Sequence, residues 1–279
     1  MLPELSLAEQ IALCNQAGVT HYSLRPRIIP PNQRDQPWSF WGNHKFDLTP
    51  QRLQAEVKAI RRQLEDGGLE PFGTNPSANT NSSDEELKVH FDGAAAVGAG
   101  RVRVAPAPYP ARHFDYSTLL DQIVDRYAHI LPLAKAAGIK IVIETHMLSM
   151  AASPALAWNI CRQFDPSEIG VIFDVPNFTL EGGLAPNLAV AVLDQYIDHC
   201  HVGGMKRTEG EVDDLGFRQS GRTACALTES DSHIPSWIRA LHDANKHVPL
   251  VIEDFQSGRG GENLKGSVDQ LKRILRAIS

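Results

Sequence analysis

The stretch IKIVIETHMLSMAASPALAWNICRQFDPSEIGVIFD, residues 139–174, contains the unit on which the fold depends. It opens with an apolar, β-branched run that ends in Glu144 and closes with a similar run that ends in Asp174. The segment between the two runs has a helical pattern. A strand, a helix and a second strand in this order favour parallel neighbours in one sheet, with the helix outside it.

The same alternation continues outward in both directions. The strands we expect are Val19–Leu24, Leu69–Thr74, Arg101–Ala105, Ile139–Glu144, Ile169–Asp174, His199–Gly203 and Val248–Glu253. The helices we expect are Leu7–Ala17, Thr49–Asp66, Asp84–Ala99, Tyr116–Ala137, Pro154–Gln163, Asn187–Gln195, Ser232–Ala244 and Asn263–Ile278. Four glycines follow predicted helices, where a left-handed residue is favoured: Gly18, Gly68, Gly100 and Gly138. The pattern predicts one α/β domain over residues 1–279, a (β/α)8 TIM barrel.

The first strand of this barrel is missing or rudimentary. The first predicted element is a helix with Ser6 as its N-cap, and Met1–Leu5 is short and interrupted by proline. Two long segments, the Pro- and Trp-rich Arg25–Leu48 and the polar loop Gly204–Asp231, follow strands and should lie at the carboxyl-terminal rim. Because a missing strand leaves two open edges, we expect a second chain to cover them, in a homo- or hetero-oligomer.

Composition excludes several classes of function. The 279 residues are 42% apolar and have a formal net charge of −6, which disfavours nucleic-acid binding. No apolar run is long enough for a membrane span, and the amino terminus does not resemble a signal peptide. The four cysteines are widely spaced without a C-x-x-C pair. We therefore expect a cytoplasmic protein with reduced thiols and no membrane or nucleic-acid partner.

The chemistry lies at the strand ends. Four apolar strands finish in a carboxylate or an imidazole: Glu144, Asp174, His201 and Glu253. A single acid at a strand end is more often a helix cap, but four on neighbouring strands should converge at the barrel mouth. Three carboxylates repel one another unless a cation neutralises them. This donor set predicts one divalent metal, Mn²⁺ before Mg²⁺ or Co²⁺.

This series of ligands resembles that of the xylose isomerase-like family of sugar isomerases, epimerases and dehydratases. The resemblance covers the chain after the absent first strand. It implies a divalent metal bound by Glu144, Asp174, His201 and Glu253. It also implies a small polyhydroxylated carbonyl substrate that chelates the metal and is enolised.

Two branches of the family compete. The segment His199-Cys-His201-Val-Gly-Gly-Met-Lys-Arg207 is similar to that of ketose 3-epimerases, which implies that Arg207 holds the substrate and that Glu144 and Glu253 are the acid/base pair. That branch has a substrate-contacting histidine where this chain has Asn177. Glu144-Thr-His146 instead resembles dehydroshikimate dehydratases, in which His146 would abstract a proton before β-elimination.

The remaining candidates have plain alternatives. His146 could reach the pocket or be a loop histidine bonded to the backbone. Arg103 could project inward to bind substrate or face the helices in a salt bridge, and Trp41 could stack on substrate or pack the long loop. A related endonuclease-type enzyme is disfavoured by the acidic charge and the small ligand set, and a non-catalytic barrel subunit by the presence of all four ligands.

Overall fold

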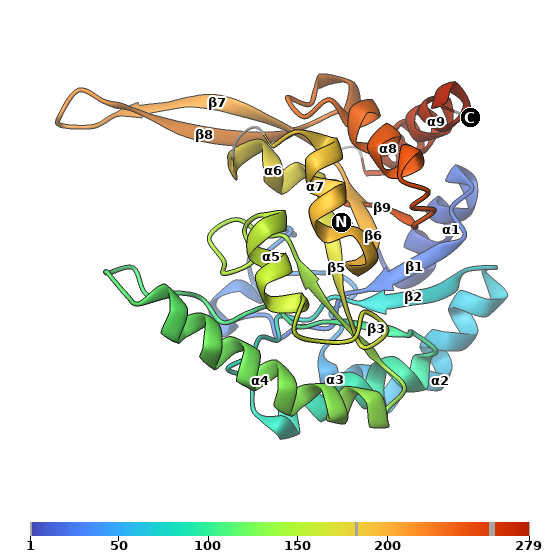
Figure 1. The fold of residues 1–279 in the computed structure, drawn as a ribbon. Helices are drawn as coiled ribbons and strands as arrows, with labels where there is room; N and C mark the ends of the chain where they lie inside the picture. Colours follow the sequence, from blue (N-terminus) through green and yellow to red (C-terminus); the bar gives the residue numbers. More distant parts are fainter. Residues whose placement is uncertain (1, 182–183, 257–259, 279) are drawn as a thin grey trace.

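The structure is a computed structural model that describes residues 2–181, 184–256 and 260–278. Seven parallel strands form one sheet in the order β1-β2-β3-β4-β5-β6-β9, and the sheet curls into an incomplete barrel (Figure 1). The strands are β1 (His21–Leu24), β2 (Glu70–Thr74), β3 (Arg101–Arg103), β4 (Lys140–Glu144), β5 (Ile169–Asp174), β6 (Ile197–Val202) and β9 (Leu250–Ile252). All seven predicted strands are present, β5 with the predicted bounds and the other six with one or both ends shifted, which confirms the barrel fold.

Helices connect the strands and lie outside the sheet (Figure 1). They are α1 (Leu7–Ala17), α2 (Pro50–Asp66), α3 (Asp84–Val97), α4 (Tyr116–Ala136), α5 (Pro154–Cys161), α6 (Val175–Glu181), α7 (Pro186–Leu193), α8 (Ile234–Asp243) and α9 (Gly260–Ile278). Neighbouring helices pack against one another around the barrel, including α2 on α3, α7 on α8 and α1 on α9. No helix in the described ranges is long and apolar enough to cross a bilayer.

The ends of the helices follow the sequence signals closely. Ser6 caps α1 as predicted, with its hydroxyl accepting from the Glu9 amide while the Glu9 carboxylate accepts from the Ser6 amide at 2.7 Å. Gly18 and Gly138 have the predicted positive φ, 73° and 70°, as has Gly68. The prediction for Gly100 is wrong, because α3 ends two residues early and Gly98 takes the left-handed conformation.

The segment before α1 forms no strand in its described part. Residues 2–5 make a turn in which the Leu5 amide donates to the Leu2 carbonyl at 3.2 Å. Leu2 lies against Gly260, just beyond β9, and the Lys45 amide donates to the Pro3 carbonyl. The turn therefore lies at the carboxyl-terminal rim, where α1 begins, and the first strand position is not filled by residues 2–5.

Two elements were not expected from the sequence. The segment Gly204–Asp231, interpreted as a long polar loop, contains an antiparallel hairpin of β7 (Gly204–Val212) and β8 (Arg218–Cys225). Figure 1 shows this hairpin projecting far from the barrel. Both faces of the hairpin are largely exposed, so its sequence lacks the apolar alternation that marks a half-buried strand. Helix α6 was missed because it starts directly after β5, without a loop.

A charged cluster fills the amino-terminal end of the barrel. The Asp198 carboxylate contacts Arg101 at 2.6 Å, Lys140 at 3.0 Å and His199 at 2.9 Å. Gly170 leaves the space for this cluster, because a Cβ at that position would lie 2.9 Å from the Asp198 Cβ. His199 connects this cluster to the other end of the barrel, because its ring centroid lies 5.3 Å from that of His201 while its Nδ1 contacts Asp198.

Candidate metal centre

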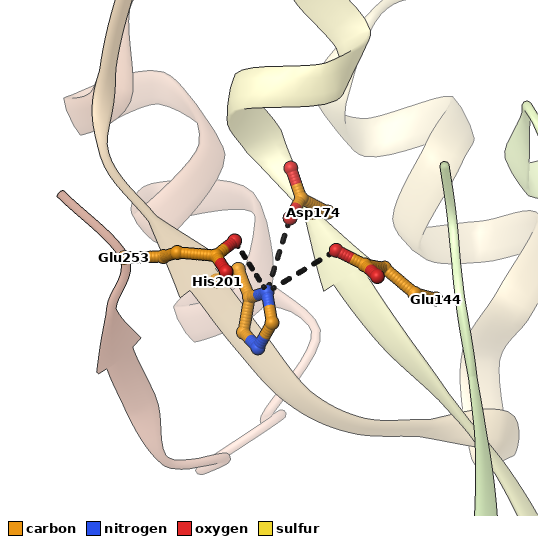
Figure 2. A group of neighbouring side chains, drawn as sticks. All are labelled: Glu144, Asp174, His201 and Glu253. Atoms are coloured by element: carbon orange, nitrogen blue, oxygen red, sulfur yellow. Dashed lines mark hydrogen bonds and ion pairs between the residues drawn. The ribbon is translucent and has the colours of Figure 1, made fainter. Parts of the chain in front are cut away.

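The four predicted ligands converge at the carboxyl-terminal end of the sheet. Glu144 is the last residue of β4, Asp174 the last of β5, His201 lies near the end of β6, and Glu253 follows β9. Parallel strands end at the same edge of the sheet, so the ends of these four strands bring the four side chains together. Figure 2 shows the three carboxylates grouped around one nitrogen of His201.

That nitrogen is His201 Nδ1. It lies 3.0 Å from Asp174 Oδ2, 3.2 Å from Glu253 Oε2 and 3.6 Å from Glu144 Oε1. One donor atom from each of the four residues lies within 4.8 Å of the others. Two ligands that each bind a cation at about 2.1 Å and at right angles are about 3 Å apart, so the spacing fits a small divalent ion.

Burial makes these charges depend on one another. The side chains of Glu144, Asp174 and His201 are 4% exposed or less, and that of Glu253 is 25% exposed. Burial, together with the neighbouring carboxylate Glu144 and against the opposing effect of His201, raises the pKa of Asp174 to about 7. Three acids in so small a volume need a compensating cation.

His201 carries that compensation in the metal-free protein. Burial opposes its protonation, but Glu253, Asp174 and Glu144 outweigh burial and hold the pKa of His201 well above its usual value. A divalent ion bound by the same carboxylates would take the place of the Nδ1 proton. The other ring nitrogen, Nε2, is buried and has no hydrogen-bond partner among the residues described.

Arg103 points inward, as one of the two predictions for it required, but it contacts a candidate metal ligand. Its guanidinium forms an ion pair with Glu144 Oε2 and donates to the Pro76 carbonyl at 3.2 Å. Burial alone would raise the pKa of Glu144, whereas Arg103 and His201 hold it well below its usual range. Arg103 therefore orients Glu144 and keeps it ionised.

Asn177 is also close to the cluster and also engaged within the protein. Its side chain is buried and donates to the Thr145 carbonyl at 3.1 Å. Its backbone amide donates to Asp174 Oδ1 at 2.8 Å, which leaves Asp174 Oδ2 facing His201. The first turn of α6 thus fixes the orientation of the Asp174 carboxylate.

His146 lines the same cavity as the four candidate ligands. Its Nδ1 lies 2.7 Å from the Met147 carbonyl, which can only accept a hydrogen bond. In the neutral imidazole Nδ1 therefore carries the proton, and Nε2 is left with a lone pair. The alternative of a loop histidine bonded to the backbone is therefore observed, whereas the role of His146 as a base stays a prediction, with Nε2 as the nitrogen that would act.

The rim beside the cluster is aromatic and basic. Trp41 stacks on Phe255 with ring centroids 5.6 Å apart, and the Arg25 guanidinium lies 4.7 Å from the Trp41 ring centroid. All three residues line the cavity, whose volume is about 1310 Å³. Trp41 therefore lies where a substrate ring could contact it while it also packs the long loop.

Arg207 is placed differently from the other candidates. It lies on β7 with an exposed side chain and is not among the residues that line the cavity. Its cross-strand neighbour Arg222 does line the cavity. The role of Arg207 as a substrate clamp stays a prediction, and in this structure the hairpin presents Arg222 to the cavity instead.

Sequence reasoning missed Arg25 and Arg222. Arg25 directly follows β1, just as Glu253 directly follows β9, so strand-end placement alone could have indicated it. Arg222 had no comparable signal, because its position depends on the unpredicted hairpin. All four cysteines are free and buried, which agrees with the absence of predicted disulfides.

Comparison with known proteins gives the same fold. Residues 37–277 match the family described as xylose isomerase-like TIM barrel. No curated protein matches the sequence. Similar solved structures include the probable 3-DHS dehydratase AsbF from Bacillus anthracis, with 16% identity, a TM-score of 0.69, and coverage of 96% of this chain and 94% of that one.

Two further solved structures resemble the whole chain. One is a D-psicose 3-epimerase determined in the presence of D-fructose, with 13% identity, a TM-score of 0.64, and coverage of 98% and 92% of the two chains. The other is a xylose isomerase-like TIM barrel protein from Mycobacterium smegmatis in complex with magnesium, with 16% identity, a TM-score of 0.62, and coverage of 99% and 90%. At these identities the likeness concerns the fold.

Proposed function

Because this chain belongs to the xylose isomerase-like TIM barrel family, we propose that it is a divalent-metal-dependent isomerase or epimerase that enolises a small sugar or keto-sugar. The observation that carries the proposal is the convergence of three carboxylates on His201 Nδ1 at the mouth of the barrel (Figure 2). Oxygen donors with one imidazole favour Mn²⁺, with Mg²⁺ or Co²⁺ as alternatives. A bound divalent ion would polarise the substrate carbonyl and stabilise the enediolate that forms when the α-proton leaves.

Glu253 is the carboxylate best placed to carry that proton. Both oxygens of Glu144 are engaged, Oε1 facing His201 and Oε2 paired with Arg103. Glu253 contacts His201 through Oε2 and is the most exposed of the four candidate ligands. A ligating carboxylate acts as a base only with a lone pair free toward the substrate, and we assign this role to Oε1 of Glu253.

Epimerisation needs a second proton carrier on the opposite face of the enediolate, and Glu144 is the family's candidate for it. Arg103 holds the pKa of Glu144 low, which suits a metal ligand better than a proton donor. Arg103 would have to move toward the substrate to release Glu144 for this role. In this proposal the side chains of Arg103, Asn177 and Trp41 also contact the bound sugar or keto-sugar.

A lyase is the second candidate, and His146 is the observation that favours it. Its Nδ1 is bonded to the Met147 carbonyl, so its Nε2 lone pair would be the base of a β-elimination, in which the α-proton is removed and a β-hydroxyl leaves. A keto-sugar, keto-glycoside or dehydroshikimate-like compound would be the substrate. That the protein acts in the cytoplasm, without membrane or nucleic-acid partners, stays a prediction.

The experiment is substrate turnover in deuterated buffer. Purified protein is stripped with chelator, reloaded with Mn²⁺, Mg²⁺ or Co²⁺, and incubated with a panel of ketohexoses and 3-dehydroshikimate. Proton NMR then follows deuterium at the enolised carbon and identifies the product. We expect metal-dependent exchange with an epimer or isomer. A metal-dependent unsaturated product selects the lyase, and turnover that survives complete metal removal refutes both.

A further inference from the structure

The two end strands of the sheet face each other without pairing. Every strand from β2 to β6 has a neighbour on both sides, whereas β1 pairs with β2 alone and β9 with β6 alone. Within the described ranges no backbone hydrogen bond joins β1 to β9. The facing edges therefore present N–H and C=O groups that a closed barrel would pair.

The walls of this gap are apolar and incompletely buried. All six residues of β5 and of β6 are buried, whereas β1 is buried only at Leu24 and all three residues of β9 are half-buried. We call the gap the β1/β9 slot and define it by these lining residues: Val19, Tyr22, Leu250, Ile252, Leu264 and Leu271. A parallel sheet normally has both faces covered, so this exposure is unusual.

The helices α1 and α9 lie outside the slot and would cover a strand docked in it. α1 and α9 pack against each other, and both contribute residues to the cavity that includes the slot. That cavity continues to Glu144, Asp174 and His201. A strand lying in the slot would be covered by helices outside and by the barrel interior inside, and it would exclude water from the metal centre.

The two ends of the slot differ in charge. Its amino-terminal end is lined by Lys246, His247 and Lys272. Lys246 pairs with Asp194 at 2.6 Å, but no ion pair of Lys272 is present among the described residues, and its Nζ lies beside Gly18. The carboxyl-terminal end carries both signs of charge, with Glu253 and Asp254 after β9 and Arg25 after β1. An occupant with acidic residues at its amino end matches this polarity.

From these observations we propose that the β1/β9 slot docks one extended β-strand of another polypeptide, parallel to β1 and β9, apolar on both faces and acidic at its amino end. Edges on both sides require an extended backbone. The six-residue length of β5 and β6 corresponds to about 20 Å of strand. A second copy of this chain has no strand to offer, because every strand in its described part is already paired.

The test uses a probe strand. The sequence Glu-Asp-Val-Ile-Val-Ala-Val-Gly is fused ahead of Met1, since residues 2–5 lie at the rim where such a strand would end. The matched control has proline at two of the valine positions, because proline cannot donate to a ladder. Hydrogen exchange by mass spectrometry reports β1 and β9, with β5 as the internal reference. The same peptide is also offered separately to the unfused protein.

We expect the probe strand to slow amide exchange in β1 and β9 at least tenfold, with β5 unchanged and the proline control without effect. The free peptide should do the same with increasing concentration. Lys272→Glu should weaken the protection, and replacing the Glu-Asp end of the probe by Lys-Lys should restore it. The proposal is overturned if neither probe protects β1 and β9. It is equally overturned if the unfused protein is a dimer by light scattering with both strands already protected.

Discussion

Loading the metal-free protein with Mn²⁺ should expel protons from the four-residue cluster. The pKa of His201 lies well above its usual value, so at pH 7 the imidazole is protonated. Burial raises the pKa of Asp174 to about 7, so its carboxyl group is about half protonated. Both groups must be deprotonated to bind a cation. We therefore expect between about one and two protons to be released per ion at pH 7.

The sign and size of the pH effect follow from this count. Both shifts raise the pKa, so protons compete with the metal more strongly as the pH falls. The metal affinity should drop about ten- to hundredfold per pH unit below neutrality. At a free metal concentration of 100 times Kd the native state gains about 2.7 kcal/mol. For a chain of this size that gain raises the Tm by about 5–11 °C.

Titration calorimetry at pH 7 in two buffers with different ionisation enthalpies measures the number of protons released, and a melting series with and without Mn²⁺ measures the stabilisation. Asp174→Asn removes one of the two protonated groups and should reduce both effects. Glu209→Gln changes an exposed carboxylate on β7 and serves as the matched control. The reasoning fails if no proton is released, or if Asp174→Asn gains as much Tm from Mn²⁺ as the natural sequence does.

Three further results are expected. Glu253→Gln should lower kcat by about 10²–10⁴-fold while the circular dichroism spectrum stays unchanged, because the residue is the proposed proton carrier. His146→Ala should stop a lyase to a similar extent with the metal still bound, but should slow an epimerase by about tenfold or less. Asp198→Ala should lower the free energy of unfolding by about 3 kcal/mol in urea, because it leaves Arg101 and Lys140 without their shared carboxylate. Burial alone would raise the pKa of Asp198, but His199, Lys140 and Arg101 hold it below its usual value, so this contribution is present above about pH 4 and declines in stronger acid.

For each of these variants a specific result would contradict the expectation. Turnover of Glu253→Gln at the natural rate would exclude it as the proton carrier. A large loss in His146→Ala together with metal loss would support neither reaction. For Asp198→Ala, an unchanged urea midpoint at pH 7 would show that the charged cluster at the amino-terminal end of the barrel contributes little to stability.

The sequence by itself determined the repeating unit and located the four candidate metal ligands. Glu144 and Asp174 are found where apolar runs end, and a parallel sheet must bring such ends to one edge. Local signals also located α1, because the Ser6 cap and Gly18 act through neighbouring backbone groups. These features depend on residues close in the chain, which is why they could be predicted.

Only the tertiary structure decided which side chains hold the ligands in place. Arg103 pairs with Glu144 from 41 residues away in the sequence. The backbone amide of Asn177 orients Asp174 from α6, a helix that was not predicted because no loop separates it from β5. The hairpin places Arg222 at the cavity, and the sequence did not indicate this because exposed strands have no apolar period. The open edges of β1 and β9 were expected from the missing first strand, but the charges and apolar residues that line the gap between them come from segments far apart in the chain and are seen only in the folded sheet.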